Sequence, residues 1–337
     1  MSRNMYKWFE EIIASPIKKA LPILSFPCVQ LMDISVTELI SSSELQSKGL
    51  QKVAERVDTM ASVSFMDLSV EAECFGSTIR YSEEEVPTVI GSVVSTMEEA
   101  EALKIPETGA GRTQLYIDAI GDAVQHITDR PVFAGVIGPY SLAARLMDVT
   151  EIMIYSYEEP ELVHLILDKV TSFLAEYCLA YKKMGANGVM MAEPVAGLLS
   201  PSFIQEFSSD YVRKIVEKVQ DENFPIIYHN CGNTILKGVD EILKCGAHAF
   251  HFGNAVDMEE MMARVPSDVV AMGNVDPAGV MRHGTAELVY QTTTDVLERC
   301  SKYPNFAISS GCDIPPMTSW ENIDAFFKAV DDFYSKK

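Results

Sequence analysis

Short apolar runs alternate with longer amphipathic segments along most of this chain. Each apolar run is rich in β-branched, aromatic or small residues and is bounded by turn residues, which is typical of buried strands. The predicted strands span residues 21–27, 61–67, 131–138, 188–193, 226–231, 247–252, 268–274 and 306–310.

The segments between these runs have apolar residues at helical spacing. The predicted helices span residues 5–13, 29–39, 47–59, 97–103, 112–127, 140–148, 158–184, 201–219, 234–244, 257–265, 285–300 and 319–334. Residues 71–80 interrupt the rhythm, and we interpret them as an excursion such as a hairpin.

Eight alternating strand–helix units in one chain predict an α/β protein with a single (β/α)8 TIM barrel and N-terminal helical additions. No Pro/Gly/Ser-rich linker divides residues 1–337, so we expect one domain. A doubly wound open sheet is the alternative. No Gly-x-Gly-x-x-Gly follows the first predicted strand, which weakens a nucleotide-binding interpretation.

Charge and composition narrow the possible partners. The formal net charge of -21 repels nucleic-acid phosphates and anionic lipid, so we expect neither nucleic-acid nor membrane binding. No apolar run approaches the roughly 20 residues of a membrane span, and no signal core opens the chain, so we expect a cytoplasmic protein. Seven Cys in so long a chain do not indicate a disulfide framework.

Polar residues follow the apolar runs at several strand ends. In a barrel the functional face is formed by the carboxyl-terminal ends of the strands, which would gather these side chains at one mouth. The strand-end residues are Asp67, Glu193, His229 with Cys231, Asn274 with Asp276, and Cys312.

His229 and Cys231 are two positions apart, so their side chains point the same way from the end of a strand. Cys312 follows the last predicted strand. One imidazole and two thiolates suit a tetrahedral zinc ion with an open fourth position. Each residue alone could equally be a core residue, since free Cys is often buried.

Two anionic sulfurs would neutralise the charge of Zn²⁺, which makes a bound water a poor source of hydroxide. A substrate thiol at the open position would lose its proton yet stay electron-rich. The ligand set therefore favours alkyl transfer to sulfur over hydrolysis.

Several motifs together carry a family resemblance. They are residues 229–233 (His-Asn-Cys-Gly-Asn), 311–316 (Gly-Cys-Asp-Ile-Pro-Pro), 192–194 (Ala-Glu-Pro), 199–201 (Leu-Ser-Pro), 273–277 (Gly-Asn-Val-Asp-Pro) and 70–76 (Val-Glu-Ala-Glu-Cys-Phe-Gly). Over essentially its whole length the chain resembles the uroporphyrinogen decarboxylase superfamily, and within it the branch of methylcobamide:coenzyme M methyltransferases.

The resemblance implies a TIM barrel with zinc on His229, Cys231 and Cys312. It also implies transfer of a methyl group from a methylated corrinoid protein to a thiol. The chain has no Asp-x-His-x-x-Gly motif, so methylcobalamin or another corrinoid is expected to arrive on a partner protein. Coenzyme M is the thiol that the branch suggests, and tetrahydrofolate is another possible acceptor.

Two departures from the family bear on the acceptor. Gly253 or Asn254 stands where the branch can carry an acidic zinc ligand, so the fourth ligand stays open. Residues 25–28 (Ser-Phe-Pro-Cys) stand where the decarboxylases carry Arg-Gln-Ala-Gly-Arg-Tyr to grip carboxylates. This disfavours a uroporphyrinogen decarboxylase-like activity, which remains an alternative beside a non-catalytic barrel that binds a corrinoid protein.

The other polar residues have a functional and a structural interpretation. Glu193 is predicted to be a catalytic and substrate-binding residue near the zinc, where it would orient a ligand or substrate, although it could also be a solvated loop-end carboxylate. Asn274 and Asp276 are predicted to line the pocket, but Asp276 could simply begin the next helix. His248 and His251 we interpret as packing residues, with an approach of His251 to the site as the alternative. The remaining cysteines we interpret as structural: Cys28, Cys74, Cys178, Cys245 and Cys300.

Overall fold

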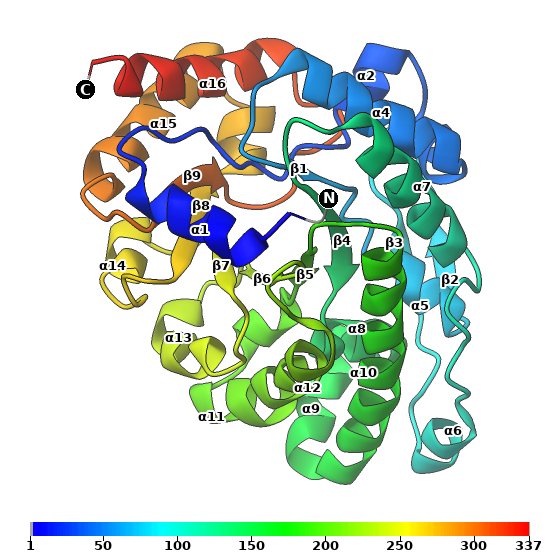
Figure 1. The fold of residues 1–337 in the computed structure, drawn as a ribbon. Coiled ribbons are helices and arrows are strands. Elements are labelled where there is room, and N and C mark those ends of the chain that lie inside the picture. Colours follow the sequence, from blue (N-terminus) through cyan, green and yellow to red (C-terminus); the bar gives the residue numbers. More distant parts are fainter. Residues whose placement is uncertain (1–2, 337) are drawn as a thin grey trace.

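The computed structural model describes residues 3–336, and it is organised around one curled parallel sheet with helices outside it (Figure 1). Seven strands neighbour one another in the order β1-β4-β5-β6-β7-β8-β9, and β2 pairs with β3 in a separate antiparallel ribbon. The strands are β1 (Ser62–Val63), β2 (Thr78–Arg80), β3 (Thr88–Ile90), β4 (Val132–Ile137), β5 (Val189–Ala192), β6 (Ile226–Asn230), β7 (Ala249–Phe252), β8 (Val270–Val275) and β9 (Phe306–Ser310).

Helices follow nearly every strand of the sheet, as the alternation in the sequence predicts. They are α1 (Met5–Ala14), α2 (Cys28–Met32), α3 (Val36–Ile40), α4 (Ser43–Arg56), α5 (Val70–Cys74), α6 (Met97–Ala102), α7 (Thr113–His126), α8 (Pro139–Met147), α9 (Val149–Glu158), α10 (Pro160–Lys183), η1 (Val195–Leu198), α11 (Pro201–Phe203), η2 (Ile204–Ser209), α12 (Asp210–Val219), α13 (Ile235–Leu243), α14 (Met258–Met262), η3 (Pro277–Arg282), α15 (Ala286–Cys300) and α16 (Trp320–Tyr334). No helix within residues 3–336 is long and apolar enough to cross a membrane.

The first predicted strand, residues 21–27, is wrong: this segment is extended but forms no strand. Pro22 and Pro27 lack the N–H that a ladder needs. The segment nevertheless touches both edge regions of the sheet. Leu21 N–H donates to the Ile308 carbonyl of β9 at 3.0 Å, and Ala20 accepts from Met60 N–H, just before β1, at 2.9 Å. The eight predicted strands are therefore seven, with residues 20–23 between the two edges.

The segments between the strands differ from the prediction in several places, and the short helices η1 and η3 were not predicted. The segment 29–39 is two helices, α2 and α3, because Asp33 adopts a left-handed conformation with φ 54°. The helix α9 was not predicted, and it precedes α10 directly. The excursion at residues 71–80 contains α5 and then β2, which pairs with β3 as a hairpin.

The inner face of the sheet has an apolar layer and a polar layer. Side chains alternate along each strand, so Ile227, Ala249 and Ala307 share the inner face. They belong to one buried cluster with Phe9 of α1, whose first turn hydrogen-bonds to Glu222, ahead of β6. The amino-terminal end of the sheet is thereby filled, and α1 lies over one end of the strands in Figure 1.

We predict that Phe9→Ala lowers the free energy of unfolding by about 3 kcal/mol or more, because it opens a cavity between α1 and the inner face. Phe9 is 2% exposed. Denaturant unfolding of the variant measures the loss. Glu10→Ala, at the exposed neighbouring position, is the control and should stay within about 0.5 kcal/mol of the wild type. Equal effects of both changes would contradict this packing role of α1.

Candidate metal centre

The structure brings together the three residues that the sequence pattern singled out as metal ligands. His229 is in β6, Cys231 comes one residue after that strand, and Cys312 comes two residues after β9. One ligand atom from each lies within 4.8 Å of the others. His229 is 1% exposed, whereas both thiols are half-buried. The group therefore lies at the carboxyl-terminal ends of the strands, and its two cysteines are partly exposed.

A chain of hydrogen bonds fixes which nitrogen of His229 is free. The carbonyl of Leu21 can only accept, so the Ser309 hydroxyl donates to it at 2.7 Å. The Ser309 oxygen then accepts from Nε2–H of His251 at 2.7 Å. Nδ1 of His251 is left to accept from Nδ1–H of His229 at 2.8 Å. His229 Nε2 therefore carries the lone pair, 3.5 Å from the Cys312 sulfur.

This chain requires a neutral His251. Burial is the main cause that lowers the pKa of His251 well below its usual value, and the neighbouring His229 lowers it further. The imidazole is completely buried, and a charge there would be costly. The two imidazoles are neighbours because His229 of β6 pairs with His251 of β7 in the sheet. The interpretation of His251 as a simple packing residue is thus corrected, while His248 does pack, stacked on Tyr6.

The two thiols at the centre share one proton unequally. The hydrogen bond from Cys312 is the largest cause that lowers the pKa of Cys231, and His229 lowers it further, whereas burial raises it. The same hydrogen bond and burial raise the pKa of Cys312 well above its usual value. Cys231 is thus the thiol of the pair that ionises more readily, and the thiolate is the form that binds metal.

This donor set fits zinc. A tetrahedral zinc ion with Zn–N near 2.1 Å and Zn–S near 2.3 Å separates its nitrogen and sulfur ligands by about 3.6 Å. The observed separation of 3.5 Å between His229 Nε2 and Cys312 Sγ is close to that value. Within residues 3–336 no carboxylate belongs to the group, so three protein ligands leave one position for a substrate.

Neither residue at the expected acidic position supplies a carboxylate. Gly253 packs directly on Cys231: a Cβ at residue 253 would lie 2.5 Å from the Cys231 Cβ, so no side chain fits there. Asn254 is exposed, and its amide oxygen lies beside Gly311, next to Cys312. The loop after β7 thus supports the centre by close backbone approach.

Glu193, which the sequence analysis placed near the metal, lies one residue after β5 and is fully buried. Its carboxylate accepts hydrogen bonds from the backbone N–H groups of Tyr140 and Ser141, in the first turn of α8. Its carbonyl accepts from the amide of Asn230, between two of the metal-binding residues, at 2.7 Å. Burial raises the pKa of Glu193 to about 8, although these N–H groups oppose the shift.

Asn274 and Asp276 hold the loops around the centre. The amide of Asn274 donates to the carbonyls of Gly253 and Val256, both at 2.9 Å. The carboxylate of Asp276 accepts from Ala278 and Gly279, and so caps η3. Their observed contacts are therefore with loops at the mouth, and those of Asp276 match its interpretation as the residue that begins a helix.

With this geometry established, known proteins can be compared. A family model described as uroporphyrinogen decarboxylase (URO-D) matches residues 18–333. The chain belongs to the uroporphyrinogen decarboxylase family. The resemblance inferred from the motifs is confirmed.

Both branches of the URO-D family occur among the relatives. The methylcobamide:CoM methyltransferase MtbA of Methanosarcina acetivorans is 26% identical over 328 residues, covering 93% of this chain and 94% of that protein. A uroporphyrinogen decarboxylase of Hydrogenovibrio crunogenus is 24% identical over 313 residues, covering 90% and 87%. A solved methyltransferase from Methanosarcina mazei has the same fold, with a TM-score of 0.84 over 97% of this chain and 98% of that one, at 23% identity.

This URO-D family member has a second polar cluster at the mouth, and its central residue, Arg112, was missed from the sequence. The guanidinium binds the carboxylates of Asp67 at 2.5 Å and Glu73 at 2.6 Å, and the hydroxyl of Ser69 at 2.9 Å. Tyr116 adds a hydrogen bond to Asp67 at 2.8 Å. Asp67 is thus committed to an internal ion pair, which the charge pattern along the chain could not show.

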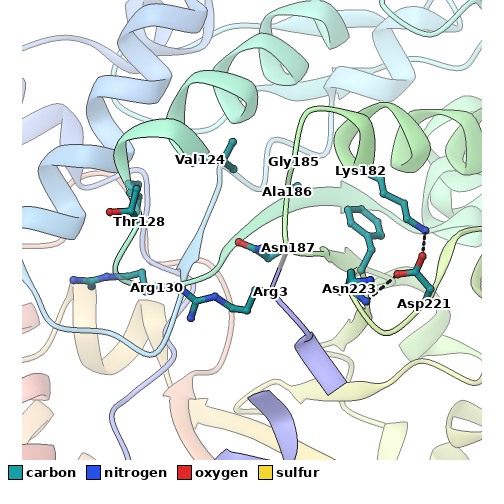
Figure 2. Close-up of a pocket in the computed structure, with 12 residues that line it drawn as sticks. Arg3, Val124, Thr128, Arg130, Lys182, Gly185, Ala186, Asn187, Asp221 and Asn223 are labelled. Carbon is teal, nitrogen blue, oxygen red and sulfur yellow. Dashed lines mark hydrogen bonds and ion pairs between the residues drawn. The ribbon is translucent and has the colours of Figure 1, made fainter. Parts of the chain in front are cut away.

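A cavity of about 720 Å³ lies away from these groups (Figure 2). It opens at the amino-terminal ends of β4, β5 and β6, beside Asn187 and Phe224. Figure 2 shows Lys182 turned toward Asp221 on its rim, where the two form an ion pair of 2.6 Å. None of the predicted site residues lines this cavity, so its size does not make it the functional site.

We predict that Ser309→Ala weakens zinc binding about 10- to 100-fold, because His251 then loses the partner that fixes its tautomer. Competition with a chromogenic chelator measures the affinity. Ser310→Ala is a matched control: Ser310 is the next residue of β9, equally buried, and its hydroxyl accepts from Ile23 N–H. Unchanged affinity in Ser309→Ala would contradict the hydrogen-bond chain.

We predict that stability falls as pH rises from about 5 to 8, and that Glu193→Gln reduces this fall. The folded-state pKa of about 8 lies above the usual 4.5, so the folded protein holds a proton that the unfolded chain releases in this range. One such group destabilises by up to about 1.4 kcal/mol per pH unit.

Denaturant unfolding at several pH values measures the effect. The stability of Glu193→Gln relative to wild type should rise with pH. The exposed Glu217→Gln is the control and should track the wild type. A difference between Glu193→Gln and wild type that does not vary with pH would show that Glu193 is ionised throughout.

Proposed function

We propose that this URO-D family member is a zinc-dependent methyltransferase, which moves a methyl group from a methylated corrinoid protein to a thiol. The observation that carries the proposal is the grouping of His229, Cys231 and Cys312 within 4.8 Å, with their thiols half-buried at the mouth. The relatives named for methylcobamide and CoM agree with this chemistry.

Zinc, when bound, supplies a Lewis acid that lowers the pKa of a thiol in its neighbourhood. His229, Cys231 and Cys312 would hold the ion, and His251 would keep Nε2 of His229 free for it. The two cysteine sulfurs neutralise the positive charge, so an acceptor sulfur stays electron-rich. The thiol proton leaves to water at the mouth, where both cysteines are half-buried.

The transfer step itself is a displacement on carbon. The acceptor thiolate forms a new S–CH3 bond while the Co–CH3 bond of the corrinoid breaks. The electron pair of the broken bond stays on cobalt, which passes from Co(III) to Co(I). The corrinoid is a substrate carried by a partner protein, and it approaches from the mouth of the curled sheet.

The other predicted site residues would act by positioning. Glu193, through its carbonyl and Asn230, would hold the segment between His229 and Cys231. Asn274 would keep the loop after β7 against Cys231, and Asp276 would fix η3 at the rim. Glu193 would take part in catalysis directly only where a group of the methyl acceptor comes within hydrogen-bonding distance of its buried carboxylate.

Decarboxylation of a tetrapyrrole carboxylate is the alternative, because uroporphyrinogen decarboxylases are among the relatives. That substrate presents several carboxylates and needs cations to receive them. Arg112 at the mouth is already paired with Asp67 and Glu73. Two reactive thiols have no part in such a reaction, which makes the methyltransferase the better account.

We predict about one zinc per chain in the wild type and at least a tenfold weaker affinity in Cys312→Ser. Metal analysis measures the zinc, and loss of methyl from methylcobalamin with added thiol measures the activity, which should fall with the zinc. Cys74→Ser is the matched control, since Cys74 is also half-buried and its sulfur donates to the Ala110 carbonyl, as a hydroxyl can.

A folded, metal-free wild type that gains no activity with zinc would contradict the proposal. Turnover of uroporphyrinogen by that protein would establish the decarboxylase alternative instead. Loss of zinc in Cys74→Ser as well as in Cys312→Ser would show that the effect is not specific to the candidate centre.

A further inference from the structure

Two cysteine side chains of the candidate metal centre face one another. The sulfurs of Cys231 and Cys312 lie within 4.8 Å of each other, and the two thiols are hydrogen-bonded. Each cysteine belongs to a loop that follows a strand, β6 for Cys231 and β9 for Cys312. The two thiols are therefore close in space although they are far apart in the sequence, and they can react with each other.

The other cysteines have different surroundings. Both members of the pair are partly exposed, so a small solute can reach them. Cys74 is also partly exposed, but its sulfur donates to the Ala110 carbonyl at 2.8 Å, and among the contacts of residues 3–336 none joins it to another cysteine. The buried cysteines are Cys28, Cys178, Cys245 and Cys300. Accessibility and a neighbouring thiol thus coincide at the pair.

The loops that carry the pair leave room for a bond between the sulfurs. A disulfide brings its two sulfurs to about 2.05 Å, and cysteines whose side chains point apart cannot form one. The hydrogen-bonded sulfurs already point toward each other. The pairing of β6 with β7 ends at Asn230, and that of β8 with β9 ends at Ser310, so neither cysteine is part of the sheet. Side-chain rotation and a small loop movement would close the gap without breaking a strand pair.

We propose that Cys231 and Cys312 are a site of reversible oxidation, at which a hydroperoxide converts the two thiols of the metal-free protein into an intramolecular disulfide. The inference goes beyond the proposed function. It needs only the contact between the two sulfurs, and it holds whether or not the protein transfers methyl groups.

The reaction consumes one hydroperoxide for each disulfide. One thiol sulfur attacks the peroxide and the O–O bond breaks, which gives a sulfenic acid, while the thiol proton leaves with the other oxygen as an alcohol or water. The second sulfur then forms the S–S bond and displaces the hydroxyl group, which takes up the second thiol proton and leaves as water. The two sulfurs lose two electrons in total, and the peroxide oxygens gain them.

Oxidation and metal binding compete for the same two sulfurs. A disulfide sulfur is not the thiolate that binds metal, so the oxidised centre would keep His229 as its one ligand. A small thiol can reverse the reaction by exchange: two such molecules form their own disulfide and restore both cysteines. A thiol acceptor would thus also keep the centre in its reduced form.

Thiol counting on the metal-free full chain, before and after one equivalent of hydrogen peroxide, tests the inference. We expect the wild type to lose two of its seven thiols and to regain both with dithiothreitol. Mass spectrometry of its peptides should identify the Cys231–Cys312 disulfide. Zinc affinity, measured against a chromogenic chelator, should be at least about a hundredfold weaker in the oxidised protein.

The zinc-loaded protein provides a second measurement. Its two thiols should be lost about tenfold more slowly, because both sulfurs are bound to the ion, and zinc should appear in solution as they are lost. If the metal-free chain does not stay folded, this arm decides the matter: loss of both thiols without release of zinc contradicts the inference.

Single substitutions show whether the two sulfurs react as a pair. Cys231→Ser and Cys312→Ser each leave one sulfur at the centre, so peroxide should give a sulfenic acid that dimedone traps, and no disulfide. Cys74→Ser is the control and should lose two thiols as the wild type does, because the pair is intact.

The outcomes separate this inference from the proposed function. Retention of all seven thiols in the folded, metal-free wild type overturns the inference, and so does a disulfide that involves Cys74 or a second chain. A wild type that forms the Cys231–Cys312 disulfide but never binds zinc contradicts the proposed function and supports this inference. A wild type that binds zinc and methylates a thiol, but forms no disulfide, has the opposite meaning.

Discussion

A single hydrogen-bond chain, from the Leu21 carbonyl through Ser309 and His251 to His229, determines what the centre of this protein can do. Each member has one role, because a carbonyl can only accept and a neutral imidazole has one donor and one acceptor. The chain begins on residues 20–23, which hydrogen-bond to β9 and lie beside β1. The contact that joins the sheet edges thus also orients the imidazole, so folding and ligand geometry are coupled.

The inner face of the sheet makes this arrangement possible. Its lower layer is apolar and is filled by α1, whereas the next inward positions of β6, β7 and β9 carry His229, His251 and Ser309. The apolar layer excludes water on one side of the centre, and the half-buried cysteines are accessible to water on the other side. An ion at this boundary would have rigid protein ligands on one side and an open approach on the other, which is what a catalytic zinc site requires. The ion pair of Arg112 with Asp67 joins the segment after β1 to the start of α7.

The sequence was sufficient for the strand–helix alternation, because period-two and helical patterns report burial directly. It was also sufficient for His229, Cys231 and Cys312, which follow strand ends and belong to a family pattern. The sequence could not show that residues 21–27 form no strand. Each proline removes only its own N–H group, so a strand held by the remaining backbone hydrogen bonds was still compatible with the sequence. Ser309 and His251 could have been found from the sequence, because side chains alternate along a strand and both residues occupy inward-facing positions, as His229 does.

X-ray absorption at the zinc edge tests the central claim most directly, because it counts the sulfur atoms around the metal. The account predicts two sulfurs and one imidazole nitrogen in the zinc-loaded protein, with a third sulfur near 2.3 Å after a thiol acceptor is added. Zinc surrounded only by nitrogen and oxygen would contradict the proposed ligands. A sulfur count that does not rise with saturating thiol would contradict the proposal that the centre activates the acceptor.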